Sequence, residues 1–224
     1  MSGSLGDIVT TLFGESTQTV DIIVLLTILT ILPSILLMLT GFTRILIVLS
    51  FVRNALGMQQ TPPNQVLIGL ALFLTLFVMQ PVFDRVYEEA YVPFTNQEIN
   101  QEEFIEKAMV PTREFMFSQA VDTDVNFFIA MSGQEFDTAA DIPNSVLIPA
   151  FLTSEIKQAF LIGFVIYIPF IVVDMIVASV LMSMGMMMLP PAMISLPFKV
   201  LLFVLVDGWQ LIIGSVVQSF LRGG

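Results

Sequence analysis

The 224-residue sequence contains no cysteine and no histidine, and only 12% of its residues are charged. The absence of cysteine excludes disulfides and thiolate nucleophiles, and the absence of histidine excludes an imidazole base. Zinc sites built on cysteine or histidine are excluded for the same reason. Nothing resembles the glycine-rich phosphate loop G-x-x-x-x-G-K-[ST]. We therefore expect neither an enzyme nor a nucleotide-driven motor, and we expect no metal or other cofactor.

Apolar residues dominate the chain. They make up 56% of it, which is more than the core of a soluble domain of this size needs. The net charge of −11 is concentrated in one stretch, because residues 84–141 contain thirteen acidic side chains against three basic ones, a net of −10. An acidic chain is a poor partner for nucleic acid. The composition predicts an integral membrane protein with one polar, acidic segment and no nucleic-acid partner.

Four apolar regions cover residues 20–39, 66–82, 146–180 and 192–220. The first is about 20 residues and so about 30 Å long as a helix, enough to cross a bilayer, and Pro33 should kink it. The pattern predicts an all-α, membrane-associated fold in which two long helical hairpins are separated by a polar, acidic, mostly helical domain. The predicted segments are a polar N-terminal segment (1–19), a first hairpin (20–83), the acidic domain (84–145) and a second hairpin (146–224).

Two arginines predict the orientation. Arg44 and Arg53 follow the first apolar region, and basic residues that flank a span are retained on the cytoplasmic side. The acidic domain is therefore expected to be extracytoplasmic. The first 19 residues have no basic n-region, so they are not a signal peptide as written.

Charged residues also lie inside the last two apolar regions, where each costs at least a few kcal/mol, of the order of 2–3, unless it is paired or faces water. Lys199 is the only basic residue of the fourth region, and its candidate partners are Glu155, Asp174 and Asp207. A structural ion pair that fixes helix or subunit registry is one interpretation. A proton relay or ion path and a simple solvent-facing arrangement are the others.

The most unusual segment is 181–209, which holds six of the fourteen methionines. Thioether side chains are flexible and polarizable and fill irregular gaps, so a methionine turn limited by glycine and proline predicts a deformable hydrophobic constriction. Ordinary core packing and a soft Cu(I) site are the alternatives. The methionines of this turn are Met182, Met184, Met186, Met187 and Met188, and the residues that limit it are Gly185, Pro190 and Pro191.

Two long strings carry a family resemblance. They are GFTRILIVLSFVRNALGMQQTPPNQVLIGLALFLTLFVMQPV and LIPAFLTSEIKQAFLIGFVIYIPFIVVDMIVASVLMSMGMMMLPPAMISLPFKVLLFVLVDGWQLIIGS. With them, the chain from about residue 39 onward closely resembles the FliP family of type III secretion export gate proteins. The short strings YVPF and REFM resemble the flagellar branch more than the injectisome branch.

The resemblance implies a subunit of the flagellar export gate. FliP-like proteins form a pentameric ring that joins FliQ and FliR subunits and other export proteins in the bacterial inner membrane, at the flagellar basal body, with a periplasmic portion. Unfolded flagellar proteins pass through the assembly. The family's methionine gasket maps onto residues 186–188, and its ion pair between subunits maps onto Glu155 and Lys199. Much of the hydrophobic mass then lies above the bilayer plane, against a simple four-span interpretation.

Three alternatives stay open at this point. An injectisome export gate homologue belongs to the same class. A copper or small-solute transporter, with methionines as ligands, belongs to another. In a structural scaffold the methionines would only pack.

Overall fold

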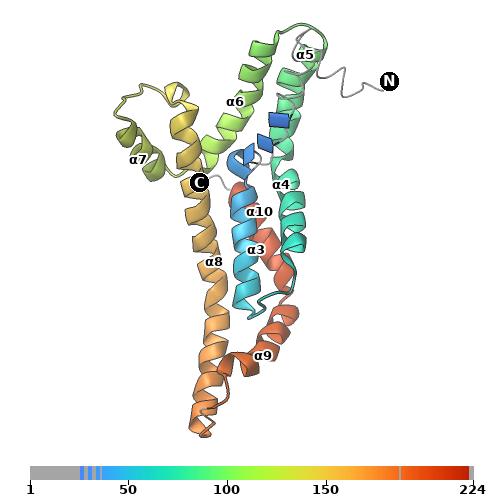
Figure 1. Cartoon of the computed structure of the whole chain (residues 1–224), viewed down its shortest axis with the longest axis vertical. Coiled ribbons are helices and arrows are strands. Elements are labelled where there is room, and N and C mark those ends of the chain that lie inside the picture. Colours follow the sequence, from blue (N-terminus) through green and yellow to red (C-terminus); the bar gives the residue numbers. More distant parts are fainter. Residues whose placement is uncertain (1–25, 28–29, 32–33, 36, 187, 222–224) are drawn as a thin grey trace. The chain divides into compact units, whose positions relative to one another are not determined.

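The computed structural model describes residues 26–27, 30–31, 34–35, 37–186 and 188–221, and every regular element within them is a helix (Figure 1). The all-α prediction is confirmed for this part of the chain. The N-terminal segment 1–19 and most of the first apolar region lie outside the described residues. The chain divides into two compact units: unit 1 is Met1–Thr40 with Pro81–Phe115, and unit 2 is Gly41–Gln80 with Met116–Gly224.

Unit 2 holds most of the helices. They are α3 (Phe42–Ala55), the first part of α4 (Asn64–Val86), α7 (Asp122–Ser132), the short 3-10 helix η2 (Ala139–Asp141), α8 (Asn144–Ser183), α9 (Pro191–Leu205) and α10 (Gly208–Leu221). Unit 1 holds the rest of α4, the π-helix η1 (Tyr87–Tyr91), α5 (Val92–Thr95) and most of α6 (Gln101–Gln119).

The core of unit 2 lies between α3 and α8, which run side by side (Figure 1). On α3, Ile45, Val48, Leu49 and Val52 have no exposed surface. Their spacing of three and four residues forms one apolar stripe of a helix, which must be buried against a partner. A Cβ atom added to Gly163 of α8 would lie 2.5 Å from the ring of a phenylalanine on α3. The glycine therefore permits the close approach of the two helices.

Prolines do not end the long helices. Helix α8 runs for 40 residues through Pro149 and Pro169, and α4 continues past Pro81, where the apolar pattern predicted its end. A proline removes one backbone donor and bends a helix, but the turns on either side keep their hydrogen bonds. The segments Asn64–Thr95 and Asn144–Ser183 are long and apolar enough to cross a membrane.

The fourth apolar region, 192–220, is two helices, because the chain bends by 66° between α9 and α10. Asp207 adopts a left-handed backbone conformation with φ of 50°. Its N–H donates to the carbonyl of Val204 (3.2 Å), and its own carbonyl accepts from Gln210 (2.9 Å). A Cβ atom on Gly208 would come within 2.3 Å of the Phe203 ring. Local backbone geometry at Asp207 and Gly208 therefore makes the corner, which hydropathy could not detect.

Unit 1 is held by polar and aromatic contacts. Helix α6 begins with a reciprocal capping box in which Asn100 and Glu103 each accept from the other's backbone N–H, at 3.0 and 3.1 Å. Arg85 pairs with Glu89 and with Glu114. The hydrogen bond from Arg85 holds the pKa of Glu114 below its usual range. The acidic segment therefore folds here through caps and exposed ion pairs.

Candidate functional site

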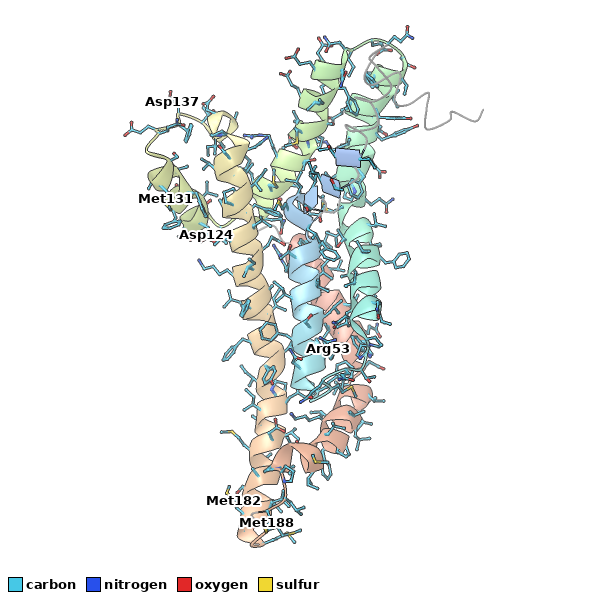
Figure 2. The ribbon with its side chains drawn as sticks, viewed as in Figure 1. Arg53, Asp124, Met131, Asp137, Met182 and Met188 are labelled. Atoms are coloured by element: carbon cyan, nitrogen blue, oxygen red, sulfur yellow. The ribbon has the colours of Figure 1, made fainter. Side chains whose placement is uncertain are left out.

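A tight turn joins α8 to α9 at one end of unit 2, where Met182 and Met188 lie (Figure 2). Helix α8 ends in a Schellman motif: Gly185 N–H donates to Met182 O (3.1 Å), and Met186 N–H donates to Leu181 O (3.0 Å). Gly185 has φ of 75°, which glycine adopts without strain. The sequence therefore fixes where α8 stops.

Two prolines start the next helix. Pro190 is the N-cap of α9 and has an extended backbone, and Pro191 is its first residue. Proline suits that position because its fixed φ is helical and its missing N–H would have had no partner. The turn is thus bounded by a glycine stop and a proline start, with the methionines between them.

The described methionines of this turn are all exposed. Their exposed fractions are 58% for Met182, 66% for Met184, 40% for Met186 and 98% for Met188. Met79 and Met116, in contrast, are fully buried. The core-packing alternative is therefore wrong for the described methionines of the turn within a single chain. Met187 lies outside the described residues.

An ion pair with a buried lysine joins the two arms of this turn. Lys199 of α9, with 6% of its side chain exposed, donates to Asp174 of α8 at 2.5 Å and to the carbonyl of Ala55 at 3.2 Å. Ser195 donates to the other carboxylate oxygen of Asp174, also at 2.5 Å. Lys199 thus caps the C-terminal end of α3 while it binds α8. We call these three side chains, Asp174, Ser195 and Lys199, the clasp.

A second buried cluster surrounds Arg44 of α3, whose side chain has no exposed surface. Its Nε and Nη2 bind the carboxylate of Glu155, Nη2 also donates to Gln119 (3.2 Å), and Nη1 donates to the hydroxyl (3.1 Å) and carbonyl (3.4 Å) of Ser219. The guanidinium also stacks 4.0 Å above the Phe220 ring. All five donors are satisfied, which a buried arginine requires.

The Arg44 cluster caps α10. Ser219 O is one of the last carbonyls of that helix, and Gln119 donates to the next one, Phe220 O, at 3.2 Å. Cations near a helix C-terminus are favourable because the helix dipole is negative there. Arg44 therefore ties α3, α6, α8 and α10 of unit 2 together.

The structure answers the question of which carboxylate meets Lys199 within one chain: it is Asp174. Glu155 binds Arg44 instead. A contact between Glu155 and Lys199 of two different subunits needs a second chain, so it stays a prediction. Arg44 was treated as a charge that flanks a span, but it is buried inside α3 and gives no support to the predicted orientation. An arginine amid apolar residues was the one available signal of its role.

Two further charges of the last two apolar regions, Lys157 and Asp207, have different surroundings. Lys157 pairs with Asp124 at 3.1 Å, and Asp124 also accepts from Ser154 at 2.8 Å, which fastens α7 to α8. Asp207 is exposed at the α9–α10 corner, and the structure places none of the other predicted site residues against it. Within the described ranges, no three acidic side chains converge to hold a metal ion.

These features define an all-helical, membrane-associated protein whose apolar helices carry paired internal charges and end in an exposed thioether turn. The profile of the FliP family matches residues 25–216. The chain belongs to the FliP family.

Individual relatives agree with this assignment. A flagellar biosynthetic protein FliP of Pectobacterium carotovorum subsp. carotovorum is 58% identical over 209 residues, covering 92% of this chain and 81% of the relative. The protein of the same name from Bacillus subtilis (strain 168) is 54% identical over 204 residues, covering 91% and 92%. That of Caulobacter vibrioides is 52% identical over 211 residues, covering 94% and 79%.

Proposed function

We propose that the chain is a pore-forming subunit of the flagellar type III export gate, which passes unfolded flagellar proteins across the bacterial inner membrane. Membership of the FliP family and the relatives named flagellar biosynthetic protein support the export apparatus as its place. The pore role rests on one observation. The methionine turn is exposed, and it lies at the end of a hairpin whose two arms are joined by the clasp.

The turn acts as a gasket in this proposal. A gate that passes many different unfolded chains cannot rely on contacts specific to one shape. Thioethers are apolar enough to exclude water and ions, and flexible enough to yield to any side chain. Met186, Met187 and Met188, flanked by Met182, Met184 and the Gly185 and Pro190–Pro191 boundaries, would form the seal when several copies surround one axis.

Assembly as a ring, with five copies as the family resemblance implies, is supported by the apolar surface of α8. Phe160, Phe164 and Met175 are each more than half exposed. An open groove of about 410 Å³ between α8 and α9 is lined entirely by apolar side chains, Val177 and Phe198 among them. FliQ and FliR subunits, other export proteins and membrane lipid are the proposed neighbours of such surfaces.

Contact between Glu155 of one subunit and Lys199 of the next is part of this proposal. Each residue already has a partner in its own chain, Arg44 and Asp174 respectively. In the assembly, Glu155 and Lys199 would therefore each bind a residue of the other subunit as well as the partner in their own chain.

The acidic segment 84–145 would lie on the periplasmic side of the assembly.

The test is to replace the methionines at 186, 187 and 188 with alanine and to measure ion leakage and flagellar protein export in cells. Leakage should rise while the complex still assembles, because alanine leaves a gap where the thioethers closed the pore. Met131→Ala is the matched control, since Met131 is 68% exposed but lies at the opposite end of unit 2 (Figure 2).

If ion leakage is unchanged in the triple variant, the proposed gasket role of these methionines is wrong. Stoichiometric Cu(I) binding by the purified protein that is lost in the same variant would favour a copper transporter instead.

A further inference from the structure

The methionine turn exposes its sulfur atoms to whatever reaches the end of unit 2. The chain has no cysteine, so thioethers are its only oxidisable sulfur groups. Met188 is 98% exposed, and Met182 and Met184 are each more than half exposed. Met79 and Met116, in contrast, are buried in unit 2. Because oxidation requires contact with the oxidant, the turn should react well before the core methionines do.

The reaction is the transfer of one oxygen atom to sulfur. The thioether sulfur attacks one oxygen of hydrogen peroxide, so that an S–O bond forms while the O–O bond breaks. The departing hydroxide takes the proton of the transferred oxygen and leaves as water. Sulfur is oxidised by two electrons, and the peroxide is reduced by the same two. The product, methionine sulfoxide, is a polar side chain in place of an apolar one.

A sulfoxide oxygen needs a hydrogen-bond donor, and most donors of the turn are already used. The N–H groups that donate to carbonyls of the turn or of the end of α8 are those of Met184, Gly185, Met186 and Leu189. Pro190 and Pro191 have no N–H to offer. The hydroxyl of Ser183 donates to the carbonyl of Val180 at 2.7 Å. A sulfoxide at this turn would therefore bind water.

The contacts that hold the turn in shape use no methionine side chain. The left-handed backbone of Gly185 ends α8, and Pro190 and Pro191 begin α9. The clasp joins the two arms through a carboxylate, a hydroxyl and an ammonium. Oxidation should therefore change the polarity of the turn and leave its backbone in place.

We propose that the methionine turn is an oxidation-sensitive seal, in which a peroxide converts Met182, Met184, Met186 and Met188 to sulfoxides and thereby admits water and ions. The inference rests on the proposed gasket and makes its methionines a modification site. A hydrophobic constriction blocks ions because water leaves it, and the sulfoxide oxygens return water to it. In the proposed ring the turn borders the channel, and hydrogen peroxide is small enough to enter there.

The modification is reversible in principle. A methionine sulfoxide reductase removes the added oxygen as water, while two thiols of the reducing system become a disulfide. The thioether is then restored, and the constriction excludes water again. Oxidised and reduced turns would thus be two states of one seal.

Exposed methionines elsewhere serve as internal references. Met131 is 68% exposed and lies at the opposite end of unit 2 from the turn (Figure 2). Met175 on α8 and Met193 on α9 are also more than half exposed. All three should be oxidised by the same treatment. Because they lie outside the turn, their sulfoxides should leave the seal closed.

The first experiment maps the modification. The assembled complex is purified in detergent and treated with hydrogen peroxide for increasing times, and mass spectrometry measures the sulfoxide at each methionine. Met182, Met184 and Met188 should be oxidised at least about tenfold faster than Met79 and Met116.

The second experiment measures the effect on the seal. The treated complex is reconstituted into vesicles only after the peroxide has been removed, so that no lipid is oxidised. Ion leakage of the unsubstituted complex should rise to the level of the alanine triple variant, and it should return to background when a methionine sulfoxide reductase and a thiol act before reconstitution.

Two variants are the controls for leakage. In the first, the methionines at 182, 184, 186 and 188 are replaced with leucine, which is apolar, similar in volume and resistant to peroxide. This variant should leak no more after treatment than before it. The second is Met131→Leu, which should respond to peroxide as the unsubstituted chain does.

The outcomes separate this inference from the proposed function. If the methionines of the turn are oxidised no faster than Met79 and Met116, or if leakage rises equally in the leucine variant, the oxidation-sensitive seal is wrong. If the turn is oxidised and leakage stays at background while the alanine triple variant leaks, the inference is overturned and the gasket stands. If the alanine triple variant does not leak either, the gasket role itself fails.

Discussion

Removal of the Glu155 carboxylate is the most informative single perturbation of the fold. In Glu155→Leu, Arg44 loses the acceptor of its Nε and one of the two acceptors of its Nη2, while its charge stays fully buried. Breaking a buried ion pair by removing one partner costs about 3–5 kcal/mol, because the other charge is left uncompensated. We expect unit 2 to lose about that much unfolding free energy.

A double variant that combines Glu155→Leu with Arg44→Met tests this estimate of the lost unfolding free energy. Replacing a whole buried pair by apolar residues is often neutral, but Arg44 also donates to Gln119 and Ser219. Ser219 is only half-buried and can meet water, so the buried acceptor that would lose its donor is Gln119, at a cost of about 1–3 kcal/mol. The double variant should therefore be destabilised by about 1–3 kcal/mol, which is less than either single variant.

Trp209, the only tryptophan, gives the assay. It lies on α10 and packs edge-on against Phe203 at 5.3 Å, so its fluorescence reports unfolding of the helix that Arg44 caps. Unfolding free energies in detergent should be compared with Lys157→Met, which breaks an ion pair whose lysine is 52% exposed. Asp124 keeps the hydrogen bond from Ser154 in that variant, so the loss should be smaller than in Glu155→Leu. If the double variant lost the sum of the two single losses, the reasoning about a coupled cluster would be refuted.

Two further predictions concern the turn and the acidic segment. Gly185→Ala should destabilise the methionine turn by about 1–2 kcal/mol, since φ is 75°. Gly69→Ala, inside α4 with open space around it, should instead stabilise by about 0.5–1 kcal/mol when both are measured by unfolding in detergent. The pKa of Glu114 is lowered by Arg85, so its stabilising effect is present above the unfolded pKa of about 4.3 and is lost as the pH falls through the lower folded value. An NMR titration should show that pKa returning to its ordinary range in Arg85→Gln; an unmoved value would contradict the assignment.

Local signals in the sequence predicted much of this structure. Apolar runs placed α8 within a few residues of its ends, since 146–180 lies inside Asn144–Ser183. Gly185 and the two prolines marked the methionine turn because glycine stops helices and proline starts them. The need of Lys199 for a carboxylate also followed from its apolar surroundings, and Asp174 was one of three candidates.

Pairings across the chain could not be predicted in the same way. Arg44 and Glu155 are separated by 111 positions, and nothing local distinguishes an arginine that flanks a span from one buried among four helices. The bend between α9 and α10 could not be predicted for another reason. Its cause is the left-handed backbone of Asp207 beside Gly208, and hydropathy, which is averaged over many residues, does not depend on the backbone conformation of one residue.

The length of α8 bears on how this chain exists in a cell. Forty residues make a helix of about 60 Å, twice the roughly 30 Å of hydrocarbon in a bilayer. Its exposed apolar side chains from Phe160 to Met182 rise about 33 Å along the helix, which is close to the thickness of one bilayer's hydrocarbon. Lipid can cover a band of that length, so the apolar surface of α8 does not by itself require a neighbouring chain. In the proposed ring, neighbouring copies would cover part of the same surface, because water is a poor solvent for it.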